Sequence, residues 1–410
     1  MSGRLRVAQV VTRFMAGAGG VALRGALAVP RDRYEVVFIV GGDGDRGGGR
    51  GGGGGSSTDS GSLIERARQA GFEVTVLPRL RSEIAPADDR RALADLRSVL
   101  RAGGFDAVHT HSSKAGVLGR LAAHQLQVSR IVHTFHGFPF HSFQSAARRE
   151  AYIRIERHVG RFTDVFLAVG PAVAAEAIKR RIAPPERVRT IGVALDTAAP
   201  EPDPFARSEA RRMLGVPPGM RVVGTVGRLD FQKAPGDFVA ALAAIGRRDT
   251  FGVWIGDGPL RARVERLAAR RGLAGRMAFA GQRDDVAALL PGFDVFAMAS
   301  RYEGLPCAVV EAMVAGLPVV ATTVNAVPDI VVAGETGLLA PPGRPDVLAR
   351  AIGYLLDNPA TAARLGAAGR AQLGPHLTQG ALGTVLAETY RSPGGRDGPR
   401  QPSAPELVTP

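Results

Sequence analysis

The sequence contains little cysteine, lysine and tryptophan. Among 410 residues there is one cysteine, Cys307, one tryptophan and only three lysines. A single cysteine excludes an intrachain disulfide and a cysteine-rich zinc site. No run of about 18 uninterrupted apolar residues occurs, so we expect no transmembrane helix. Residues 1–14 enter a strand pattern directly, without the apolar core and cleavage site of a signal peptide, and we therefore expect a cytoplasmic protein.

Acidic residues are also scarce relative to basic ones, and the net charge is +14. The first 200 residues carry 29 Lys and Arg against 18 Asp and Glu, whereas the rest carry 23 against 20. A basic surface attracts nucleic acid or anionic lipid. Because no nucleic-acid-binding motif is present, we expect no nucleic acid partner. The charge instead suggests peripheral binding at the anionic inner face of the cell membrane, with an arginine-rich composition of no functional meaning as the alternative.

Strand and helix patterns alternate along both halves of the chain. Residues 5–12 (LRVAQVVT) form a continuous apolar run, as in strands buried inside a parallel sheet. Similar runs alternate with amphipathic segments up to a Pro-rich stretch at 184–204, where we place the interdomain linker. The alternation restarts at RVVGTVGRL. This order predicts the α/β class, with two Rossmann-like, doubly wound parallel-sheet domains.

The predicted domains have similar lengths. The first covers residues 1–200 and includes a flexible Gly-rich loop at 41–61, which has no apolar residue to bury. The second covers 201–390, and 391–410 form a disordered tail rich in Pro and Gly. Doubly wound sheets bind ligands beyond the carboxyl ends of their strands. We therefore expect a site in the cleft where the two domains face each other.

The stretch 300–316, SRYEGLPCAVVEAMVAG, has the pattern of a loop that leads from a strand into a helix. We place the helix start near Leu305, with Pro306 in the first turn. Free N–H groups at such a start bind anions, so a phosphate would lie over Gly304 and Leu305. Glu303 and Glu311 would repel a phosphate and would instead accept hydrogen bonds from hydroxyls. This combination predicts a nucleotide-sugar site; the alternative is an ordinary helix start with two solvated glutamates.

Basic residues and glycines follow the other strands of the second domain. Arg228 and Lys233, in GRLDFQK, can neutralise a diphosphate and stabilise its departure. The alternative is an exposed basic loop. Gly256, in GDGP, and Gly281 end the next two strands, where glycine permits close approach of a ligand to the backbone.

Six of the eight histidines lie between residues 109 and 141. Their spacing does not predict one compact metal site, and no carboxylate or cysteine accompanies them, so we expect no metal. We interpret them as polar residues at strand ends that face the cleft. Gly19 and Gly20, in MAGAGG after the first strand, form a loop of the kind that approaches phosphate.

Together these motifs resemble the retaining GT-B glycosyltransferases of family 4. The resemblance rests on EGLP with the second Glu of the E-x7-E pattern at 311, on AMVAGLPVVAT, and on GRL-x3-K. VHTHSSKAGVLGRLAA and VHTFHGFPFH are similar to segments of bacterial enzymes that build surface polysaccharides. The sequence departs from the family pattern at Ala234, where glycine is common, at 325–329, and after Gly20, where an acidic residue is frequent.

The resemblance implies roles for individual residues. Arg228, Lys233 and the N–H groups of Gly304 and Leu305 would hold the donor diphosphate. Glu311 would bind the ribose and Glu303 the sugar hydroxyls. Gly256 and Gly281 would lie beside the nucleotide. His136 would contact the reacting sugar or phosphate, while His111 and Lys114 would touch the acceptor or order its loop. Of these, Glu303, His136, Arg228 and Lys233 would be catalytic, and no cofactor is implied.

The expected function is sugar transfer in cell-surface glycan synthesis. The donor would be a nucleotide sugar, most readily a UDP-sugar, and the acceptor a saccharide or lipid-linked saccharide. One alternative is a nucleotide-sugar epimerase of GT-B-like fold, which would need no acceptor. The other is a non-catalytic nucleotide-sugar-binding protein, which would bind a donor without turnover.

Overall fold

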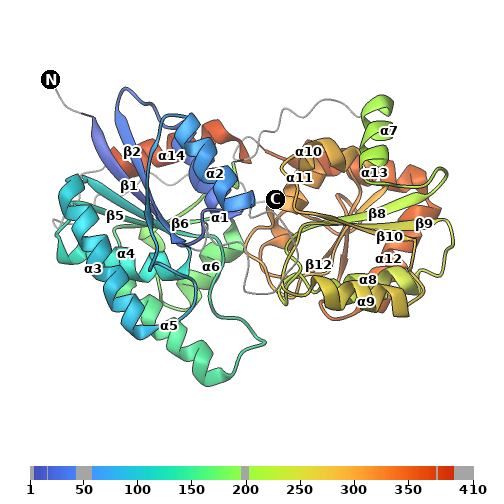
Figure 1. The fold of residues 1–410 in the computed structure, drawn as a ribbon, viewed down its shortest axis with the longest axis horizontal. Coiled ribbons are helices and arrows are strands. Elements are labelled where there is room, and N and C mark those ends of the chain that lie inside the picture. The colour runs from blue at the N-terminus through green and yellow to red at the C-terminus, as the bar shows by residue number, and fades with distance from the viewer. Residues whose placement is uncertain (1–3, 16, 43–57, 195–202, 375–376, 392–410) are drawn as a thin grey trace.

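The computed structural model describes residues 4–15, 17–42, 58–194, 203–374 and 377–391. Within these residues the chain forms two α/β domains side by side (Figure 1). Most of the predicted loop at 41–61 and nearly all of the predicted tail at 391–410 lie outside the described residues. Thr58, however, already begins a helix, so the predicted loop extended too far toward the C-terminus.

The first domain contains a seven-stranded sheet whose neighbouring strands all pair in parallel. Its order is β3 (Glu73–Leu77), β2 (Tyr34–Gly41), β1 (Leu5–Val11), β4 (Ala107–His111), β5 (Arg130–Phe135), β6 (Val165–Ala168) and β7 (Val188–Thr190). The helices between these strands are α1 (Ala18–Ala28), α2 (Thr58–Gln69), α3 (Pro86–Gly103), α4 (Ser113–Gln125), α5 (Ala146–Gly160) and α6 (Pro171–Lys179).

The second domain contains a six-stranded parallel sheet. Its order is β10 (Met277–Gly281), β9 (Thr250–Ile255), β8 (Arg221–Val226), β11 (Val295–Met298), β12 (Val319–Thr322) and β13 (Leu338–Ala340). The accompanying helices are α7 (Pro204–Met213), α8 (Pro235–Ala244), α9 (Arg261–Arg270), α10 (Val286–Leu289), α11 (Cys307–Val314), α12 (Pro345–Asp357) and α13 (Pro359–Gln372). Two doubly wound sheets confirm the predicted fold class. Across the described helices, none is both long and apolar enough to span a membrane.

The central strands are buried on both faces, which explains their continuous apolar sequences. In β1, Val7, Ala8, Val10 and Val11 have no exposed surface. In a parallel sheet covered by helices on both sides, such strands do not alternate apolar with polar residues. Burial of both faces also fixes the register of each strand, because neither face tolerates polar side chains.

The region predicted as a linker contributes to the first sheet. Residues 185–187 form a short 3-10 helix, and β7 follows as the edge strand beside β6. Pro184 and Pro185 precede β7, whose three residues include no proline. The Pro-rich composition therefore concealed a strand of three residues. Residues 195–202 of the predicted linker lie outside the described residues, and its last residue, Pro204, begins α7.

The last helix, α14 (Gln379–Arg391), returns to the first domain, as Figure 1 shows. Leu382 and Leu386 pack around Gly25 of α1, where an added Cβ would lie 2.7 Å from Leu386. The hydroxyl of Tyr34 donates to the carbonyl of Ala387 over 2.7 Å. The sequence boundary at 390 assigned this helix to the second domain; its packing places it with the first.

Candidate functional site

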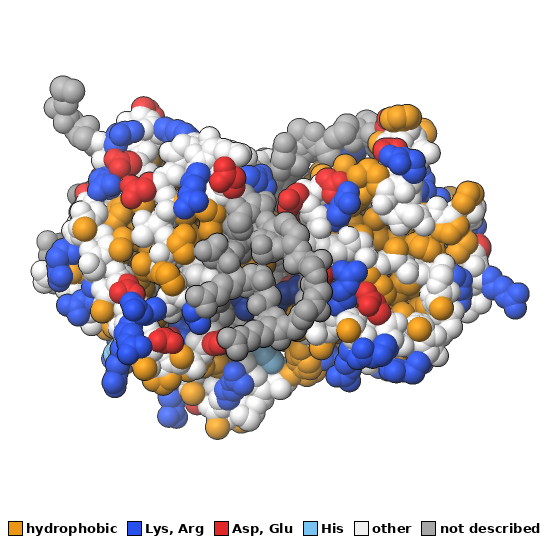
Figure 2. Space-filling view, in the orientation of Figure 1, with side chains coloured by type: hydrophobic (Ala, Val, Ile, Leu, Met, Phe, Trp, Pro, Cys, Tyr) orange, Lys and Arg blue, Asp and Glu red, His pale blue; other side chains and the backbone are white. Residues whose placement is uncertain are grey.

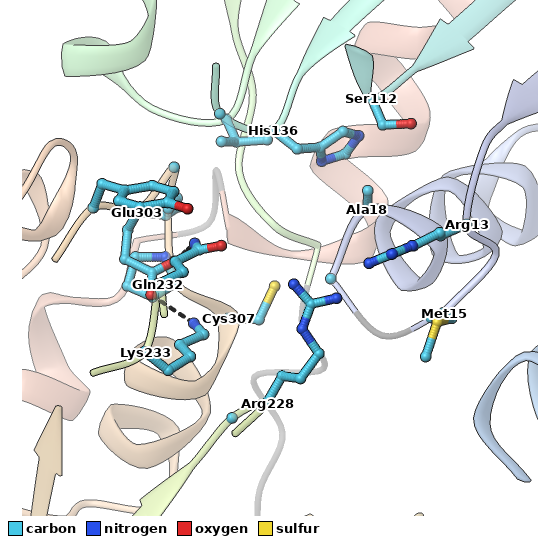
Figure 3. A pocket seen from close by; sticks show the side chains of 18 of the residues that line it. Arg13, Met15, Ala18, Ser112, His136, Arg228, Gln232, Lys233, Glu303 and Cys307 are labelled. Carbon is cyan, nitrogen blue, oxygen red and sulfur yellow. Dashed lines mark hydrogen bonds and ion pairs between the residues drawn. The ribbon is translucent and has the colours of Figure 1, made fainter. Parts of the chain in front are cut away.

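A cleft of about 1780 Å³ lies between the domains, at the carboxyl ends of both sheets. Figure 3 shows Arg228, Lys233 and Glu303 on one side, with Arg13 and Ser112 opposite them. This arrangement follows from topology, because the carboxyl ends of parallel strands meet at one edge of each sheet.

In the loop after β8, one carboxylate bonds to the side chain of Arg228 and to the backbone of Lys233. Asp230 accepts a hydrogen bond from Arg228 Nε over 2.6 Å and another from the backbone N–H of Lys233 over 3.1 Å. Arg228 remains 46% exposed and points into the cleft (Figure 3). Asp230 thus orients the guanidinium of Arg228 and holds the backbone of Lys233.

Glu303 is almost fully buried, with 7% of its surface exposed. Its carboxylate accepts hydrogen bonds from Lys233 Nζ over 2.6 Å and from Gln232 Nε2 over 3.1 Å. Its backbone N–H donates to Asn325 Oδ1 over 3.2 Å. A buried carboxylate needs such partners to remain charged. Glu303 and Lys233 therefore form one buried ion pair rather than two separate solvated groups.

The helix after Glu303 begins at Cys307, two residues later than predicted. Pro306 is its N-cap, with an extended backbone, rather than a residue of the first turn. A proline N-cap offers no side-chain acceptor, so the N–H groups of Cys307 and Ala308 remain at the helix start beside the cleft. The predicted anion site therefore shifts from Gly304 and Leu305 toward Cys307 and Ala308, although all four line the cleft.

Glu311 lies on the cleft side of the same helix. Burial raises the pKa of its carboxyl, and the positive charges of Arg24 and Lys233 oppose that rise. Burial also raises the pKa of the Cys307 thiol. The hydroxyl-binding role of Glu311 therefore stays a prediction, with its carboxyl placed on the cleft side.

Gly304 is a point of very close contact between the domains. A Cβ built on it would lie 1.7 Å from the carbonyl oxygen of His136 and 3.1 Å from the backbone nitrogen of Gly137. No side chain fits at that distance. The glycine of EGLP is therefore required for the approach of the two domains, in addition to any role beside a phosphate.

The Gly loop of the first domain divides into a packing residue and a cleft residue. Gly19 does not line the cleft, because it packs against Phe14, whose backbone would lie 2.9 Å from an added Cβ. Gly20 does line it and leaves room for the guanidinium of Arg24, whose Nη1 would lie 3.2 Å from an added Cβ. Arg24 donates to the carbonyl of Val193 over 3.0 Å, and its Nε is buried without a partner among the described residues.

The two glycines at the ends of β9 and β10 also differ. Gly256 lines the cleft and has a φ of 129°, and a Cβ there would lie 2.2 Å from the carbonyl oxygen of Gly227. The carbonyl of Gly281 accepts the N–H of Gly256 over 2.7 Å, but Gly281 does not itself line the cleft. Gln282 and Arg283, immediately after it, reach the cleft instead.

The three residues predicted from the histidine-rich segment have different positions. His136 lines the cleft, and burial together with the charge of Arg24 lowers its pKa to about 3. His111 is 2% exposed and contacts His136 from behind, so it does not touch an acceptor in the cleft. Lys114 lines the cleft but is paired with Asp89 over 2.5 Å, which orders the start of α3.

Sequence reasoning missed Arg24, Asp230 and Asn325. Asp230 lies inside the GRL-x3-K motif, so its position was visible although its function was not. Asn325 has a φ of 45°, and asparagine tolerates that left-handed conformation better than most residues. Ala234 has a φ of 46°, which explains why glycine is common at that position in the family. Arg24 had no sequence signal, because only the fold brings α1 to the cleft.

The described histidines, cysteine and carboxylates do not form a group of three or more that could hold a metal ion. Instead, the histidine-rich segment forms hydrogen bonds within the first domain. Arg228, Lys233 and the N–H groups at the start of α11 are positive groups that face the cleft. This set can bind a diphosphate directly.

Two family models match the chain. Residues 16–194 match the glycosyl transferase 4-like domain, and residues 206–372 match glycosyl transferases group 1. The chain is 32% identical to 2-deoxystreptamine N-acetyl-D-glucosaminyltransferase of Streptomyces fradiae, over 70% of this chain and 74% of the relative. The protein belongs to the family 4 glycosyltransferases of GT-B fold.

Other relatives are matched over less of their length. UDP-Gal:alpha-D-GlcNAc-diphosphoundecaprenol alpha-1,3-galactosyltransferase of Escherichia coli is 32% identical over 61% of this chain and 66% of its own length. 2-Deoxystreptamine glucosyltransferase of Streptomyces kanamyceticus is 38% identical over 50% and 55%, respectively. The matched part of the chain thus spans between about half and two thirds of these two relatives.

Solved structures agree with the fold. HepE of Anabaena, crystallised with UDP and glucose, has a TM-score of 0.78 at 21% identity and covers 94% of this chain and 99% of its own. WaaG, a glycosyltransferase involved in lipopolysaccharide biosynthesis, has a TM-score of 0.71 at 18% identity with the same coverage. At these identities the likeness concerns the arrangement of the two domains.

Proposed function

We propose that this protein transfers a sugar, with retention, from a nucleoside-diphosphate sugar to a hydroxyl of a saccharide or lipid-linked saccharide. One observation carries the proposal. The ion pair of Lys233 with Glu303 lies beside Arg228 and the start of α11, across the cleft from His136. The cations suit the diphosphate of the ligand, and the buried carboxylate suits the hydroxyls of its sugar. The pair therefore fits a sugar diphosphate better than a diphosphate or a sugar alone.

In this proposal the second domain binds the donor. Arg228, Lys233 and the N–H groups of α11 stabilise the charge that develops on the departing diphosphate. Glu311 accepts from the ribose, and Glu303 accepts from the sugar while it orients Lys233. UDP is the nucleotide to test first, since HepE was crystallised with UDP-glucose and the Escherichia coli relative is named for UDP-Gal.

Exposed apolar side chains on the first-domain side of the cleft support an amphipathic acceptor. Ile84, Phe143 and Ile155 line the first-domain side of the cleft and are 66%, 50% and 45% exposed. Such exposure suits a ligand with an apolar part. The Escherichia coli relative is named for a diphosphoundecaprenol-linked acceptor. We therefore propose a lipid-linked saccharide, reached at the surface of an anionic membrane.

The basic side chains of the surface are compatible with binding to an anionic membrane, although they do not form a single patch. Lys and Arg side chains are spread around the rims of both domains on the face in Figure 2. Arg148 and Arg154 on α5, and Arg161 just after it, are exposed, and α5 also carries Ile155 of the cleft lining. Attraction of this kind to anionic vesicles weakens with salt. Absence of binding to such vesicles at low salt would contradict the membrane part of the proposal alone.

The proposal is tested by measuring nucleotide release from a panel of UDP-, GDP- and ADP-sugars, with and without a bacterial lipid extract. Lys233→Ala and Glu311→Ala are assayed in parallel. Lys179→Ala is the matched control, since Lys179 lies on α6 outside the cleft. We expect lipid-dependent release from one donor, reduced at least about 100-fold by Lys233→Ala and unchanged in the control.

The alternatives give different results. Donor binding without release, lost in Lys233→Ala, would indicate a binding protein. Conversion of the free donor into its epimer without any acceptor would indicate an epimerase. Retention is tested on the product, whose anomeric configuration must match that of the donor.

A further inference from the structure

A continuous chain of buried polar side chains connects the cleft with the last helix. His136 Nε2 lies 2.8 Å from His111 Nδ1, and His111 Nε2 lies 2.5 Å from Gln9 Oε1. Gln9 Nε2 lies 2.8 Å from the hydroxyl of Tyr390 on α14. Gln9, His111 and Tyr390 are each at most 4% exposed. Residues from separate elements thus form one path of hydrogen bonds behind His136.

A second branch meets the same hydroxyl. His109 Nδ1 lies 2.7 Å from Tyr390, and His109 Nε2 lies 2.7 Å from Thr134 Oγ1. His109 is 1% exposed. Tyr390 accepts the proton of the Gln9 amide and can therefore donate its own proton to His109. This satisfies the hydroxyl in both roles for the Gln9 orientation found in the structure, with Nε2 toward Tyr390 and Oε1 toward His111.

The orientation of Gln9 determines which nitrogens carry protons. Its Oε1 can only accept, so His111 Nε2 carries a proton. Burial lowers the pKa of His111 well below its ordinary value, so the ring is neutral and its Nδ1 is bare. His136 must then donate from Nε2 to that bare nitrogen. Because the lowered pKa of His136 keeps it neutral as well, its Nδ1 carries no proton and can only accept.

We propose that Tyr390, through Gln9 and His111, holds His136 in the tautomer whose unprotonated Nδ1 accepts a hydrogen bond from a substrate hydroxyl. His136 extends into the cleft from the end of β5 (Figure 3). A bare imidazole nitrogen repels a phosphate oxygen, which is also an acceptor. The inference rests on the proposed function and deepens it: the partner of His136 is a hydroxyl of the sugar or acceptor, not the diphosphate. Gln9, His111 and Tyr390 are positioning residues.

The donor-to-acceptor direction of these hydrogen bonds is tested by nitrogen NMR on protein labelled with 15N-histidine and free of substrate. The His136 signals are assigned by their loss in His136→Gln. We expect a bare Nδ1 and a protonated Nε2, which have well-separated 15N shifts. A protonated Nδ1 would overturn the proposal. The tautomer is read on the wild-type protein and needs no activity, so the measurement stands even if the proposed donor or acceptor is wrong.

The role of Tyr390 in fixing the His136 tautomer is tested with two conservative variants, each of which removes one hydroxyl that hydrogen-bonds at α14. Tyr390→Phe removes the hydroxyl that orients Gln9, whereas Tyr34→Phe removes the bond to Ala387 and leaves the network complete. We expect Tyr390→Phe to populate both tautomers of His136 and to lower turnover about tenfold, with donor KM nearly unchanged. Tyr34→Phe should retain the single tautomer. Equal tautomer mixing in both variants would mean that α14 acts only through packing, contrary to the proposal.

A change at Gln9 gives an independent check. Gln9→Glu keeps an acceptor opposite His111 Nε2 and should preserve the tautomer of His136. Gln9→Leu removes the acceptor and should allow both tautomers. If the tautomer is the same in both variants, Gln9 does not set it and the proposal fails.

Discussion

At the scale of single residues, Gly304 is the cleft position with the least room for a side chain. Its Cα lies against the backbone of His136, and an added Cβ would be 1.7 Å from the carbonyl oxygen there. The neighbour is backbone at the end of a buried strand, so it cannot move aside cheaply. A larger residue must therefore separate the two domains.

We expect Gly304→Ala to lower kcat/KM about 100-fold, because misplacement of reacting groups by about 1 Å has an effect of that size. The melting temperature should change little, since each domain keeps its own core. Gly353→Ala is the control, because nothing lies within 4 Å of its added Cβ. Steady-state kinetics and thermal melts measure both effects. Wild-type kinetics in Gly304→Ala would show that the domains need not approach so closely.

The sequence pattern predicted that Glu303, Lys233 and Arg228 face the cleft, because their motifs are contiguous and lie at strand ends. It did not show that Glu303 and Lys233 form a buried pair, since contact between residues 70 positions apart depends on the register of β8 and β11. His111 was expected at the acceptor because strand-end residues usually face the cleft. Its side chain instead turns toward Gln9, a direction that the alternation of a strand does not determine.

At the scale of elements, α14 is a helix of the first domain that follows the second domain in the chain. Leu382 and Leu386 are 3% and 2% exposed against α1. Its helical pattern was predictable, but its partner was not, because amphipathic periodicity shows which face is buried and not what covers it.

We expect Leu386→Ala to lower the free energy of unfolding by about 2–5 kcal/mol, as cavities of this size do. The loss should concern the first domain, with faster hydrogen exchange in β1 and β2 than in the wild type. Leu348→Ala, at an equally buried site on α12, should instead affect β12 and β13, against which α12 packs. Exchange that rises equally in both sheets of each variant would mean that the domains unfold as one unit.

At the scale of the whole molecule, the buried histidines are unevenly distributed. Every described histidine belongs to the first domain, and His109, His111 and His133 are at most 2% exposed. Burial lowers the pKa of all three, to about 3 for His109. The unfolded chain binds protons near pH 6.5, whereas the native domain remains neutral. Stability is therefore complete above about pH 6.5 and is lost as the pH falls below it.

We expect acid to unfold the first domain before the second. Each of the three histidines should remove about 1.4 kcal/mol of stability per pH unit below about 6.5. The single tryptophan, Trp254, is buried in β9 of the second domain, so its fluorescence reports that domain alone. Far-UV circular dichroism should therefore begin to change at a higher pH than the fluorescence.

The control for this titration is His158→Gln, because His158 is exposed and should not alter the curve. Coincident fluorescence and circular dichroism transitions would contradict the uneven distribution of acid sensitivity.

The return of α14 to the first domain also determines the order in which the chain can fold during synthesis. The strands of the first sheet leave the ribosome long before Tyr390, which supplies the partner of Gln9 and His109. The second domain has all its strands and α7–α13 before α14 is made. Until α14 is made, the Gln9 amide nitrogen and His109 Nδ1 lack their Tyr390 partner, so the domain that is translated first is the one completed last.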